Sequence, residues 1–439
     1  MRYLEYGEFR LVRESLAERE RLWAMAPHII RPMRFVLPQT QSPRPAWMVR
    51  LGLFLYDHIG GRKRLPKTKT VALSSAAEGD GLKDRKGRGF IYSDCWVDDA
   101  RLVVLNAVDA KALGARIHTR TKFLSASRDG AGWAVRLAAS SGRHTVEARA
   151  IVNTAGPWVS EVVEQVENAH PKGRVRLIKG SHIVVPRLFD GPHAYMLQNP
   201  DRRIVFAIPY QDQFTLIGTT DVPVDEPPQR AQIDDEEIAY LLDTANRYFT
   251  TQSGRGDIVW TYSGVRPLFD DQAANVSAVT RDYVLDLDRG RGGEACLLNV
   301  FGGKITTFRR LAEHAMDELG LAGAGQAWTA GATLPGGEFA DFDTFLADVC
   351  DRYPRFAQSF LKRLARAYGT RLHTIIGDAK QIADLGEDFG GGLTRAEVDY
   401  LVANEWAQTA QDILWRRSKL GLHVPEDTED RLAAYLSAG

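Results

Sequence analysis

The spacing of hydrophobic residues divides the chain into three regions of different predicted secondary structure. Near the start, apolar residues recur at helical spacing and share one face, which comprises Phe9, Val12, Leu16 and Trp23. Between residues 176 and 275 the apolar positions alternate or form short blocks bounded by turn residues, as strands do. Beyond residue 341 the pattern is helical again. This order predicts an α/β domain, an antiparallel-sheet domain and a C-terminal helical domain.

The middle region, residues 176–275, contains most of the predicted strands. They cover Leu177–Val185, Tyr195–Leu197, Ile204–Pro209 and Phe214–Thr220. A helix over residues 235–248 follows them. Strands joined by short turns favour antiparallel pairing, so this region predicts a sheet of its own.

The flanking regions contribute three further predictions. The first domain combines residues 1–175 with residues 276–330. Within it, residues 114–123 alternate like a strand, and residues 150–153 predict a buried strand with small residues at its tip. In the helical region 341–439, Thr394 and Glu397 have the spacing of a capping box at a helix start.

Late in the first domain, a strand, a Gly-Gly turn and a helix are predicted in direct succession. The strand covers Cys296–Val300, Gly302 and Gly303 form the turn, and the helix extends to about Leu319. The glycines permit close backbone approach, and the helix start offers N–H groups to an anion or to an electron-rich ring edge. The alternative interpretation is an ordinary strand-to-helix turn.

Composition and charge exclude several classes of function. Lys and Arg together number 56, as do Asp and Glu, so no net charge favours nucleic acid as a partner. The three cysteines form no C-x-x-C pair, which indicates a reducing compartment, and the ten histidines lack metal-binding spacing. We expect a cytoplasmic protein without a metal site.

One apolar segment suits the surface of an anionic membrane. Trp47–Tyr56 predicts an apolar helix, and the basic residues Arg62, Lys63 and Arg64 follow it. The alternative is a core helix followed by a solvated basic loop. No apolar run in the sequence approaches the length of a membrane span, so we expect peripheral association with the inner face of the cell membrane.

Several polar residues lie at predicted strand ends or in loops, where they could form one site. They are Arg2, Tyr3, His182, Arg266, Arg281 and Lys304. Converging arginines would form a pocket for a small phosphate, because guanidinium groups bind phosphate in a bidentate manner. Each residue taken alone could equally form a structural ion pair, and sequence spacing does not establish that they converge.

Seven segments of the chain resemble one enzyme family. They are Arg-Tyr-Leu-Glu-Tyr-Gly from Arg2, Tyr-Ser-Asp-Cys-Trp from Tyr92, Asn-Thr-Ala-Gly-Pro-Trp from Asn153, Leu-Ile-Lys-Gly-Ser-His from Leu177, Ile-Gly-Thr-Thr-Asp from Ile217, Trp-Thr-Tyr-Ser-Gly-Val-Arg-Pro from Trp260 and Phe-Gly-Gly-Lys-Ile-Thr-Thr from Phe301. Together they resemble the bacterial respiratory, FAD-dependent glycerol-3-phosphate dehydrogenases, over essentially the whole chain. The resemblance implies a Rossmann-like FAD/NAD(P)-binding domain, an antiparallel substrate domain and a helical C-terminal domain.

The resemblance also implies a reaction and partners. The family oxidises sn-glycerol 3-phosphate to dihydroxyacetone phosphate, with hydride transfer to FAD and electrons passed on to membrane quinone. A homodimer is possible. The alternatives are a related flavin oxidase that uses oxygen, or a catalytically impaired form that acts only as an interaction module.

Residue roles follow from the resemblance alone. Four residues would bind the substrate and its phosphate: Arg2, Tyr3, Thr219 and Arg281. Three would surround the reacting C2 hydroxyl, and which one is the base stays open: His182, Arg266 and Lys304. Two turns would contact FAD: Thr154, Ala155 and Gly156 in the first, and Gly302, Gly303, Lys304, Ile305 and Thr306 in the second.

The sequence departs from the family pattern at one point. The family begins with a strand, a G-x-G-x-x-G turn that cradles the FAD pyrophosphate, and a helix. No G-x-G-x-x-G occurs in this sequence, and Arg2 matches a position well inside the family's chain. We expect a start assigned too late, at an internal methionine. The alternative is a truly truncated form, for which weak FAD binding and little activity are expected.

Overall fold

The chain forms two compact units, each assembled from several segments. In the computed structural model the described residues are 9–59, 64–169, 173–225, 228–270, 282–290, 294–320 and 326–438. The first unit comprises residues 1–18, 33–94 and 120–327, and the second comprises residues 19–32, 95–119 and 328–439. The division of the chain into cofactor and substrate domains stays a prediction.

A mixed sheet dominates the first unit. Among the described residues its order is β12-β8-β11-β10-β9-β1-β3-β2, and β13 also pairs with β8. The strands are β1 (Ile30–Pro38), β2 (Lys69–Ala72), β3 (Arg88–Val97), β8 (Val175–Pro186), β9 (Ala194–Gln198), β10 (Ile204–Tyr210), β11 (Phe214–Gly218), β12 (Val222–Pro223) and β13 (Trp260–Phe269). The antiparallel pairing predicted for residues 176–275 is confirmed. The region does not form a sheet of its own, because β1 pairs in parallel with β9 and the sheet continues through β3 to β2.

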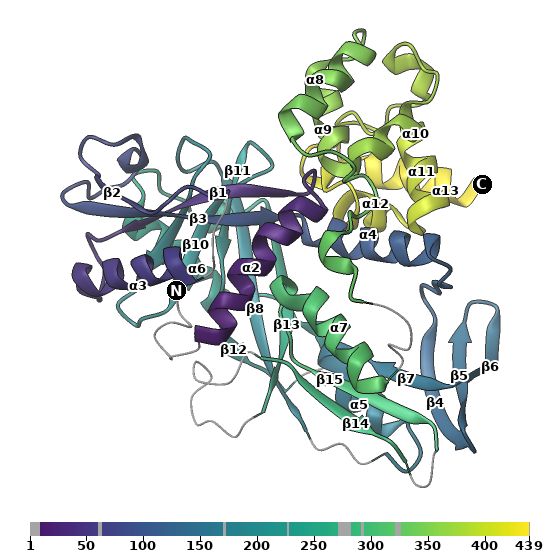
Figure 1. Cartoon of the computed structure of the whole chain (residues 1–439). Helices are drawn as coiled ribbons and strands as arrows, with labels where there is room; N and C mark the ends of the chain where they lie inside the picture. The colour runs from purple at the N-terminus through teal and green to yellow at the C-terminus, as the bar shows by residue number, and fades with distance from the viewer. Residues whose placement is uncertain are drawn as a thin grey trace. The chain divides into compact units, whose positions relative to one another are not determined.

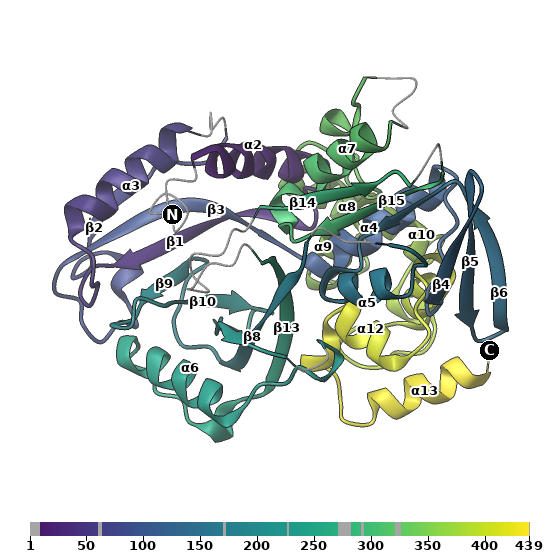
Figure 2. The same ribbon diagram turned by 90° about the horizontal axis from the view of Figure 1, so that it is seen from below.

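One face of this sheet is apolar and packs against helix α6 (Asp235–Tyr248), which Figure 2 shows in teal beside the strands. Ile183 of β8 and Ile217 of β11 are fully buried there, in one cluster with Leu241 of the helix. Side chains alternate across a strand, so the neighbouring His182 faces the opposite side. The helix predicted over residues 235–248 is confirmed.

Helix α3 (Ala46–Ile59) has two apolar faces of different exposure. Its buried face consists of Val49, Leu53 and Tyr56. The Tyr56 hydroxyl donates a hydrogen bond to Asp94 of β3 at 2.9 Å. The outer face carries Trp47, Met48, Leu51 and Phe54, with exposed fractions of 69%, 40%, 52% and 57%. The helix predicted over Trp47–Tyr56 is therefore confirmed, and part of its apolar surface faces solvent.

Two three-stranded sheets also lie in the first unit, and both can be followed in Figure 1. One is a meander of β4 (Lys122–Asp129), β5 (Gly132–Ala139) and β6 (Gly142–Ala148). The other has the order β14-β15-β7, with β14 at Val284–Asp288, β15 at Cys296–Phe301 and β7 at Ala150–Asn153. Strands β15 and β7 are parallel, with Asn299 opposite Asn153. Their carboxyl ends therefore lie side by side, and so do the turns that follow them.

Helix α7 (Phe308–Leu319) follows β15 after a short 3₁₀ turn at Ile305–Thr307. Its first turn contacts α2 (Phe9–Met25) near the middle of that helix. Buried Arg309 joins the two helices through two hydrogen bonds to the Glu18 carboxylate, each 2.7 Å long. The predicted strand at Cys296–Val300 and the helix to Leu319 are confirmed.

Two sequence predictions about strands were wrong in part. Residues 114–123 do not form a strand up to Lys122, where β4 begins. Their side chains are mostly exposed and Arg120 has a positive φ of 52°, so alternation there reflects composition and not a pleated surface. Strand β7 exists as predicted but is only half-buried, because Val152 is 44% exposed.

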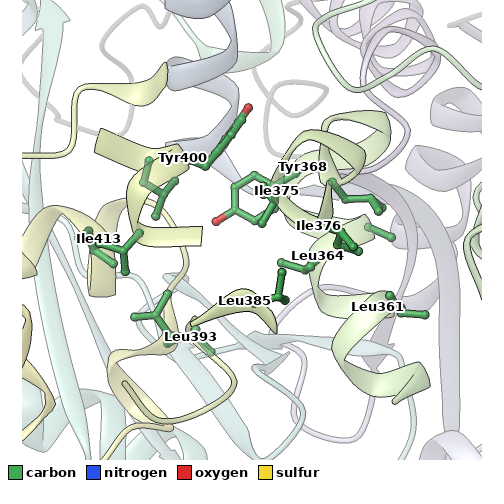
Figure 3. Packing of buried hydrophobic residues seen from close by; sticks show 14 of the residues in the cluster. Leu361, Leu364, Tyr368, Ile375, Ile376, Leu385, Leu393, Tyr400 and Ile413 are labelled. Carbon is green, nitrogen blue, oxygen red and sulfur yellow. The ribbon is translucent and has the colours of Figure 1, made fainter. Parts of the chain in front are cut away.

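The second unit is helical. Its helices are α4 (Asp99–Ala112), α8 (Phe342–Arg352), α9 (Gln358–Tyr368), α10 (Leu372–Ile376), α11 (Arg395–Glu405), α12 (Ala410–Arg416) and α13 (Thr428–Ala438), and α5 (Val159–Glu164) belongs to the first unit. Figure 3 shows their core, in which Leu364, Tyr368, Leu393 and Ile413 point toward one another and are fully buried. The predicted helical character of residues 341–439 is confirmed.

Two buried arginine–glutamate pairs hold these helices together. Arg101 of α4 binds both carboxylate oxygens of Glu405 at the end of α11, and its Nη2 lies 2.9 Å from Oε1. Arg363 of α9 binds both oxygens of Glu397, which also accepts from the Tyr368 hydroxyl at 2.6 Å. Paired in this way, the buried carboxylates keep the charge partners that burial requires.

The capping box predicted at Thr394 and Glu397 does not form. Thr394 is the N-cap residue of α11, but its hydroxyl makes no cap hydrogen bond and has no partner among the described residues. The Glu397 carboxylate turns instead to Arg363 and Tyr368 in the core. A charged donor and a buried hydroxyl outcompete a backbone N–H for this carboxylate, which sequence spacing alone does not reveal.

Candidate functional site

Residues from three strands meet on the sheet face opposite α6. His182 of β8 lies opposite Gly218 of β11 on one side and opposite Tyr262 of β13 on the other. The His182 and Tyr262 rings stack, with centroids 4.7 Å apart and planes 8° apart. A Cβ built on Gly218 would lie 2.1 Å from His182 Cδ2. Only glycine at position 218 therefore allows the imidazole to lie across the neighbouring strand.

Arg266 lies on the same face of β13 as Tyr262, because the two residues are four positions apart on one strand. Its guanidinium group donates to Thr219 Oγ1 at 3.0 Å and to Asp221 Oδ1 at 2.6 Å. A Cβ on Gly180 would lie 2.4 Å from Arg266 Nη2, so this glycine makes room for the guanidinium group. The sheet thus holds an imidazole, a hydroxyl and a guanidinium group on one side.

The Gly-Gly turn after β15 approaches the same strand. Gly302 and Gly303 have φ values of 75° and 111°, in the region that favours glycine. A Cβ on Gly302 would lie 3.0 Å from the Asp282 carbonyl oxygen and 3.7 Å from that of Pro267, the residue after Arg266. Lys304 follows the turn, and its ammonium nitrogen is buried. A second cationic side chain therefore starts next to the strand that carries Arg266.

The turn after β7 is fixed by a buried asparagine. Asn153 donates to Asn299 Oδ1 of β15 at 2.9 Å and to the Val159 carbonyl at 3.0 Å. Its own Oδ1 accepts from the Ala155 backbone N–H at 3.2 Å. The next residue, Gly156, has a positive φ of 59° and open space where a Cβ would be. This turn has an exposed backbone that a ligand could approach closely.

The arrangement has a clear chemical capability. A histidine can take a proton from a substrate hydroxyl near neutral pH. A guanidinium group held beside it can stabilise the alkoxide that develops as the proton leaves. Two glycine-containing turns at adjacent strand ends are suited to a flat or anionic cofactor.

The structure brings together most of the predicted residues that it describes. His182, Arg266 and Thr219 share one sheet face, and the turn carrying Lys304 lies beside it. Thr154, Ala155 and Gly156 form the turn after β7, next to the one that starts at Gly302. Arg2, Tyr3 and Arg281 lie outside the described residues. The roles assigned to all these residues stay predictions.

Two residues of the site had no role in the sequence analysis. Tyr262 stacks on His182, and Asp221 binds Arg266. Both lie within segments that resemble the family, so attention to strand alternation could have found Tyr262. Asp221 follows β11 in a loop, and no pattern in the sequence relates it to an arginine 45 positions away.

Comparisons with known proteins identify the family of this chain. Residues 1–293 match the family described as FAD dependent oxidoreductase, and residues 327–437 match the C-terminal domain of alpha-glycerophosphate oxidase. The chain is 51% identical over 443 residues to a glycerol-3-phosphate dehydrogenase of Pseudomonas aeruginosa, a match that covers 100% of this chain and 86% of the relative. The chain belongs to the family of FAD-dependent glycerol-3-phosphate dehydrogenases.

Two further proteins are similar to this chain, one in sequence and one in structure. A D-erythritol 1-phosphate dehydrogenase of Brucella abortus is 52% identical over 432 residues, which cover 97% of this chain and 86% of the relative. The crystal structure of a glycerol-3-phosphate dehydrogenase from Bacillus halodurans complexed with FAD superposes with a TM-score of 0.75. That match covers 96% of this chain and 84% of the other at 23% identity, and shows the shared fold. The cofactor is FAD, and the fold is that of the FAD-dependent oxidoreductases.

Proposed function

We propose that this chain oxidises sn-glycerol 3-phosphate to dihydroxyacetone phosphate and passes the electrons to membrane quinone. The observation that supports the proposal most strongly is the convergence of His182, Thr219 and Arg266 on one sheet face beside the Gly302 turn. Bound FAD supplies a hydride acceptor for the C2–H bond. The remaining requirements, a proton acceptor and charge stabilisation, belong to side chains of the chain itself.

His182 is our choice for the group that accepts the C2 hydroxyl proton. Its ring is held flat against Tyr262 and crosses Gly218, so its orientation is fixed before substrate binds. Arg266, with Lys304 as the second cation, would stabilise the developing alkoxide. Arg2 and Arg281 would bind the phosphate, with Tyr3 and Thr219 lining the pocket, as the resemblance implies.

FAD fits the residues that the two turns provide. Gly156, Gly302 and Gly303 all have positive φ and present backbone without side chains. Asn153 and Asn299 lock the strands that carry these turns. The turns would hold the flavin end of the cofactor, with Thr154 and Ala155 on one side and Lys304, Ile305 and Thr306 on the other. The exposed side chain of Ile305 is available for such a contact.

The proposal is tested with the purified protein. We expect bound flavin, seen by its visible absorbance, and dye reduction that depends on glycerol 3-phosphate. The variant His182→Gln should keep its flavin and lose about two orders of magnitude in kcat, because general base catalysis contributes roughly 10²–10⁴-fold. Flavin-loaded protein that reduces no dye with this substrate would refute the proposal. Stoichiometric hydrogen peroxide release would indicate an oxidase instead.

A second substrate should be compared with glycerol 3-phosphate, because a relative that is about as similar to this chain is named for it. The Brucella abortus relative is a D-erythritol 1-phosphate dehydrogenase, and it is 52% identical to this chain. Both named substrates are polyol phosphates, so the same base and the same cations would suit either. We expect a higher kcat/KM for glycerol 3-phosphate, and a higher value for D-erythritol 1-phosphate would transfer the proposed function to that substrate.

We further propose that the outer face of α3 docks on an anionic membrane, where quinone is found. Trp47, Leu51 and Phe54 are each more than half exposed on this face. The predicted basic cluster follows the helix; Arg62 and Lys63 lie outside the described residues, and Arg64 is exposed. Apolar side chains flanked by basic ones suit an anionic lipid surface. No helix among the described residues is long and apolar enough to span a bilayer.

The docking proposal is tested by sedimentation with vesicles that contain anionic lipid. Replacing Trp47 and Phe54 by Gln should release the protein from the vesicles without changing dye-linked turnover in solution. Charge reversal at Arg62, Lys63 and Arg64 should have the same effect, and more strongly at low salt. Partitioning that neither set of changes alters would count against docking through α3. A homodimer, which the resemblance permits, would be detected by light scattering on the protein without vesicles.

A further inference from the structure

A buried carboxylate lies directly behind the candidate site, on the other face of the sheet. Glu237 is the third residue of α6 and is 4% exposed. Its Oε1 accepts hydrogen bonds from Ser181 Oγ at 2.9 Å and from Thr220 Oγ1 at 2.5 Å. Its Oε2 lies 2.9 Å from Lys179 Nζ. A glutamate in the first turn of a helix ordinarily caps that helix alone, whereas this one also binds strand β8 and the loop that follows β11.

Helix capping accounts for none of these three contacts and adds a further one. Glu237 Oε2 accepts from the Asp234 backbone N–H at 3.1 Å, and Glu237 N–H donates to Asp234 Oδ1 at 2.9 Å, which completes a capping box. Lys179 also reaches Asp234 Oδ2, at 3.1 Å. Burial alone would lower the pKa of Lys179, but the hydrogen bonds to Glu237 and Asp234 and their charges raise it overall. Both Glu237 oxygens therefore have charged or hydroxyl donors.

The contact with Thr220 reaches the site. Thr220 Oγ1 donates to Glu237 and accepts from the Ser181 backbone N–H at 2.9 Å, which ties the end of β11 to β8. The residues on either side of Thr220 are the two that bind Arg266: Thr219 through its hydroxyl and Asp221 through its carboxylate. Thr220 thus faces α6 while its neighbours face the guanidinium group.

We propose that Glu237 is a positioning residue that fixes Arg266 in the site through Thr220. Glu237 itself contacts neither Arg266 nor His182. It anchors the middle residue of a three-residue corner, Thr219 to Asp221, whose outer residues hold the guanidinium group. The inference rests on the proposed function in one respect, namely that Arg266 stabilises charge in the oxidation of a polyol phosphate.

Thr220→Val tests the link, because valine keeps the shape and removes the hydroxyl that joins Glu237 to the Ser181 backbone. We expect kcat to fall by about tenfold or more, since small misplacements of a catalytic group cost up to roughly 10²-fold. KM should change little, because an interaction made mainly in the transition state lowers kcat and kcat/KM equally. Glu237→Gln should act in the same direction, and Thr220→Ser, which keeps the hydroxyl, should restore most of the rate.

Glu397→Gln is the matched control for lost stability. Glu397 is also a buried carboxylate bound by a cation and a hydroxyl, but it lies in the helical second unit. This variant should lower the melting temperature without changing kcat. If Thr220→Val and Glu237→Gln also lower the melting temperature and leave kcat unchanged, Glu237 is structural and the proposal is wrong.

Crystal structures of the wild type and of Thr220→Val separate this inference from the proposed function. The variant should have Arg266 displaced from Thr219 and Asp221, whatever the enzyme's substrate. An unmoved guanidinium group would overturn the inference even if the wild type oxidises glycerol 3-phosphate. Conversely, flavin-loaded wild type that is inactive with this substrate refutes the proposed function, and a displaced Arg266 would still establish the positioning role of Glu237.

Discussion

At the scale of single residues, the site depends on glycines as much as on its charged groups. Gly218 is the clearest case, because a methyl group there would lie 2.1 Å from the His182 ring. Gly218→Ala should therefore turn the imidazole away from Tyr262 and lower kcat by about tenfold or more. Gly256→Ala, where no atom lies within 4 Å of the added carbon, is the control and should leave kcat unchanged. Equal kcat values in dye reduction for Gly218→Ala and the wild type would contradict the role of His182.

A second residue predicts how stability depends on pH. His28, in the second unit, is 1% exposed, and neither ring nitrogen has a hydrogen-bond partner among the described residues. Burial, assisted by the charges of Arg101 and Arg366, lowers the pKa of His28 from 6.5 to about 3. The unfolded chain therefore binds a proton between these pH values that the folded chain does not. Stability is complete above about pH 6.5 and falls as the pH decreases toward about 3.

Urea unfolding at pH 7 and pH 5 measures this effect. The free energy of unfolding of the wild type should fall by about 2 kcal/mol more than that of His28→Leu, at about 1.4 kcal/mol per pH unit below the unfolded pKa. His144→Gln, a change at an exposed histidine, should follow the wild type. The same pH dependence in His28→Leu and in the wild type would show that His28 is protonated when folded.

The sequence singled out individual residues for the site where a motif contained them. His182, Thr219 and Arg266 were all assigned to the site by resemblance, and the structure places them on one face. Glu237 was not assigned any role, because the positioning role proposed for it depends on Thr220. That residue is 17 positions away, in the loop after β11. Contacts that cross from helix to sheet have no periodic signature in a sequence.

At the scale of elements, strands β7 and β15 lead into the two turns that are proposed to face FAD. Asn153 links both strands and holds the turn that is proposed to face FAD. Asn153→Ala should leave buried partners unsatisfied and loosen this turn, so that the purified protein retains less flavin. The measured quantity is the ratio of flavin to protein absorbance. Asn106→Ala, which removes a local bond to the Leu102 carbonyl within α4, should retain the wild-type ratio. An unchanged ratio in Asn153→Ala would exclude this turn from the cofactor site.

Elements were predictable where burial imposed a period, and not elsewhere. Helix α6 was predicted with its bounds for two reasons. One of its faces packs on a sheet, and the helix begins after an acidic cap residue. Residues 114–123 alternated in polarity without a strand partner, so the pattern carried no structural meaning. Thr394 and Glu397 had the right spacing, but a buried arginine took the carboxylate.

At the scale of the whole molecule, the second unit joins segments that are distant in the sequence. The effect of Glu405→Gln on its stability should change sign with the presence of Arg101. In the full chain, Glu405→Gln should be destabilising, because it removes the buried charge that pairs with Arg101. In an Arg101→Met background of the full chain, Glu405 loses this partner and keeps the 4.0 Å contact with Arg417. There the same substitution should be stabilising, since a buried carboxylate without its main partner is costly. Thermal unfolding followed by circular dichroism measures both differences. Destabilisation in both contexts would mean that Arg101 is not the dominant partner.

The division into units could be predicted only in outline. The sequence predicted helices for residues 341–439, and the structure confirms them. Nothing in the sequence of residues 19–32 or 95–119 indicated that they belong to the same unit as the C-terminal helices. Their attachment depends on pairs such as Arg101 with Glu405, which are not visible as a pattern in the sequence.

The pairing of Arg101 with Glu405 sets an order of events during synthesis. The two residues are 304 positions apart, so helix α4 leaves the ribosome long before its partner exists. At a synthesis rate of roughly 5–20 residues per second, Glu405 is added about 15–60 s after Arg101. During that interval the first unit can complete its sheet, whereas Arg101 of α4 is without the carboxylate that pairs with it in the folded chain. The second unit is therefore completed only when the C-terminal helices have been synthesised, long after its segments at residues 19–32 and 95–119.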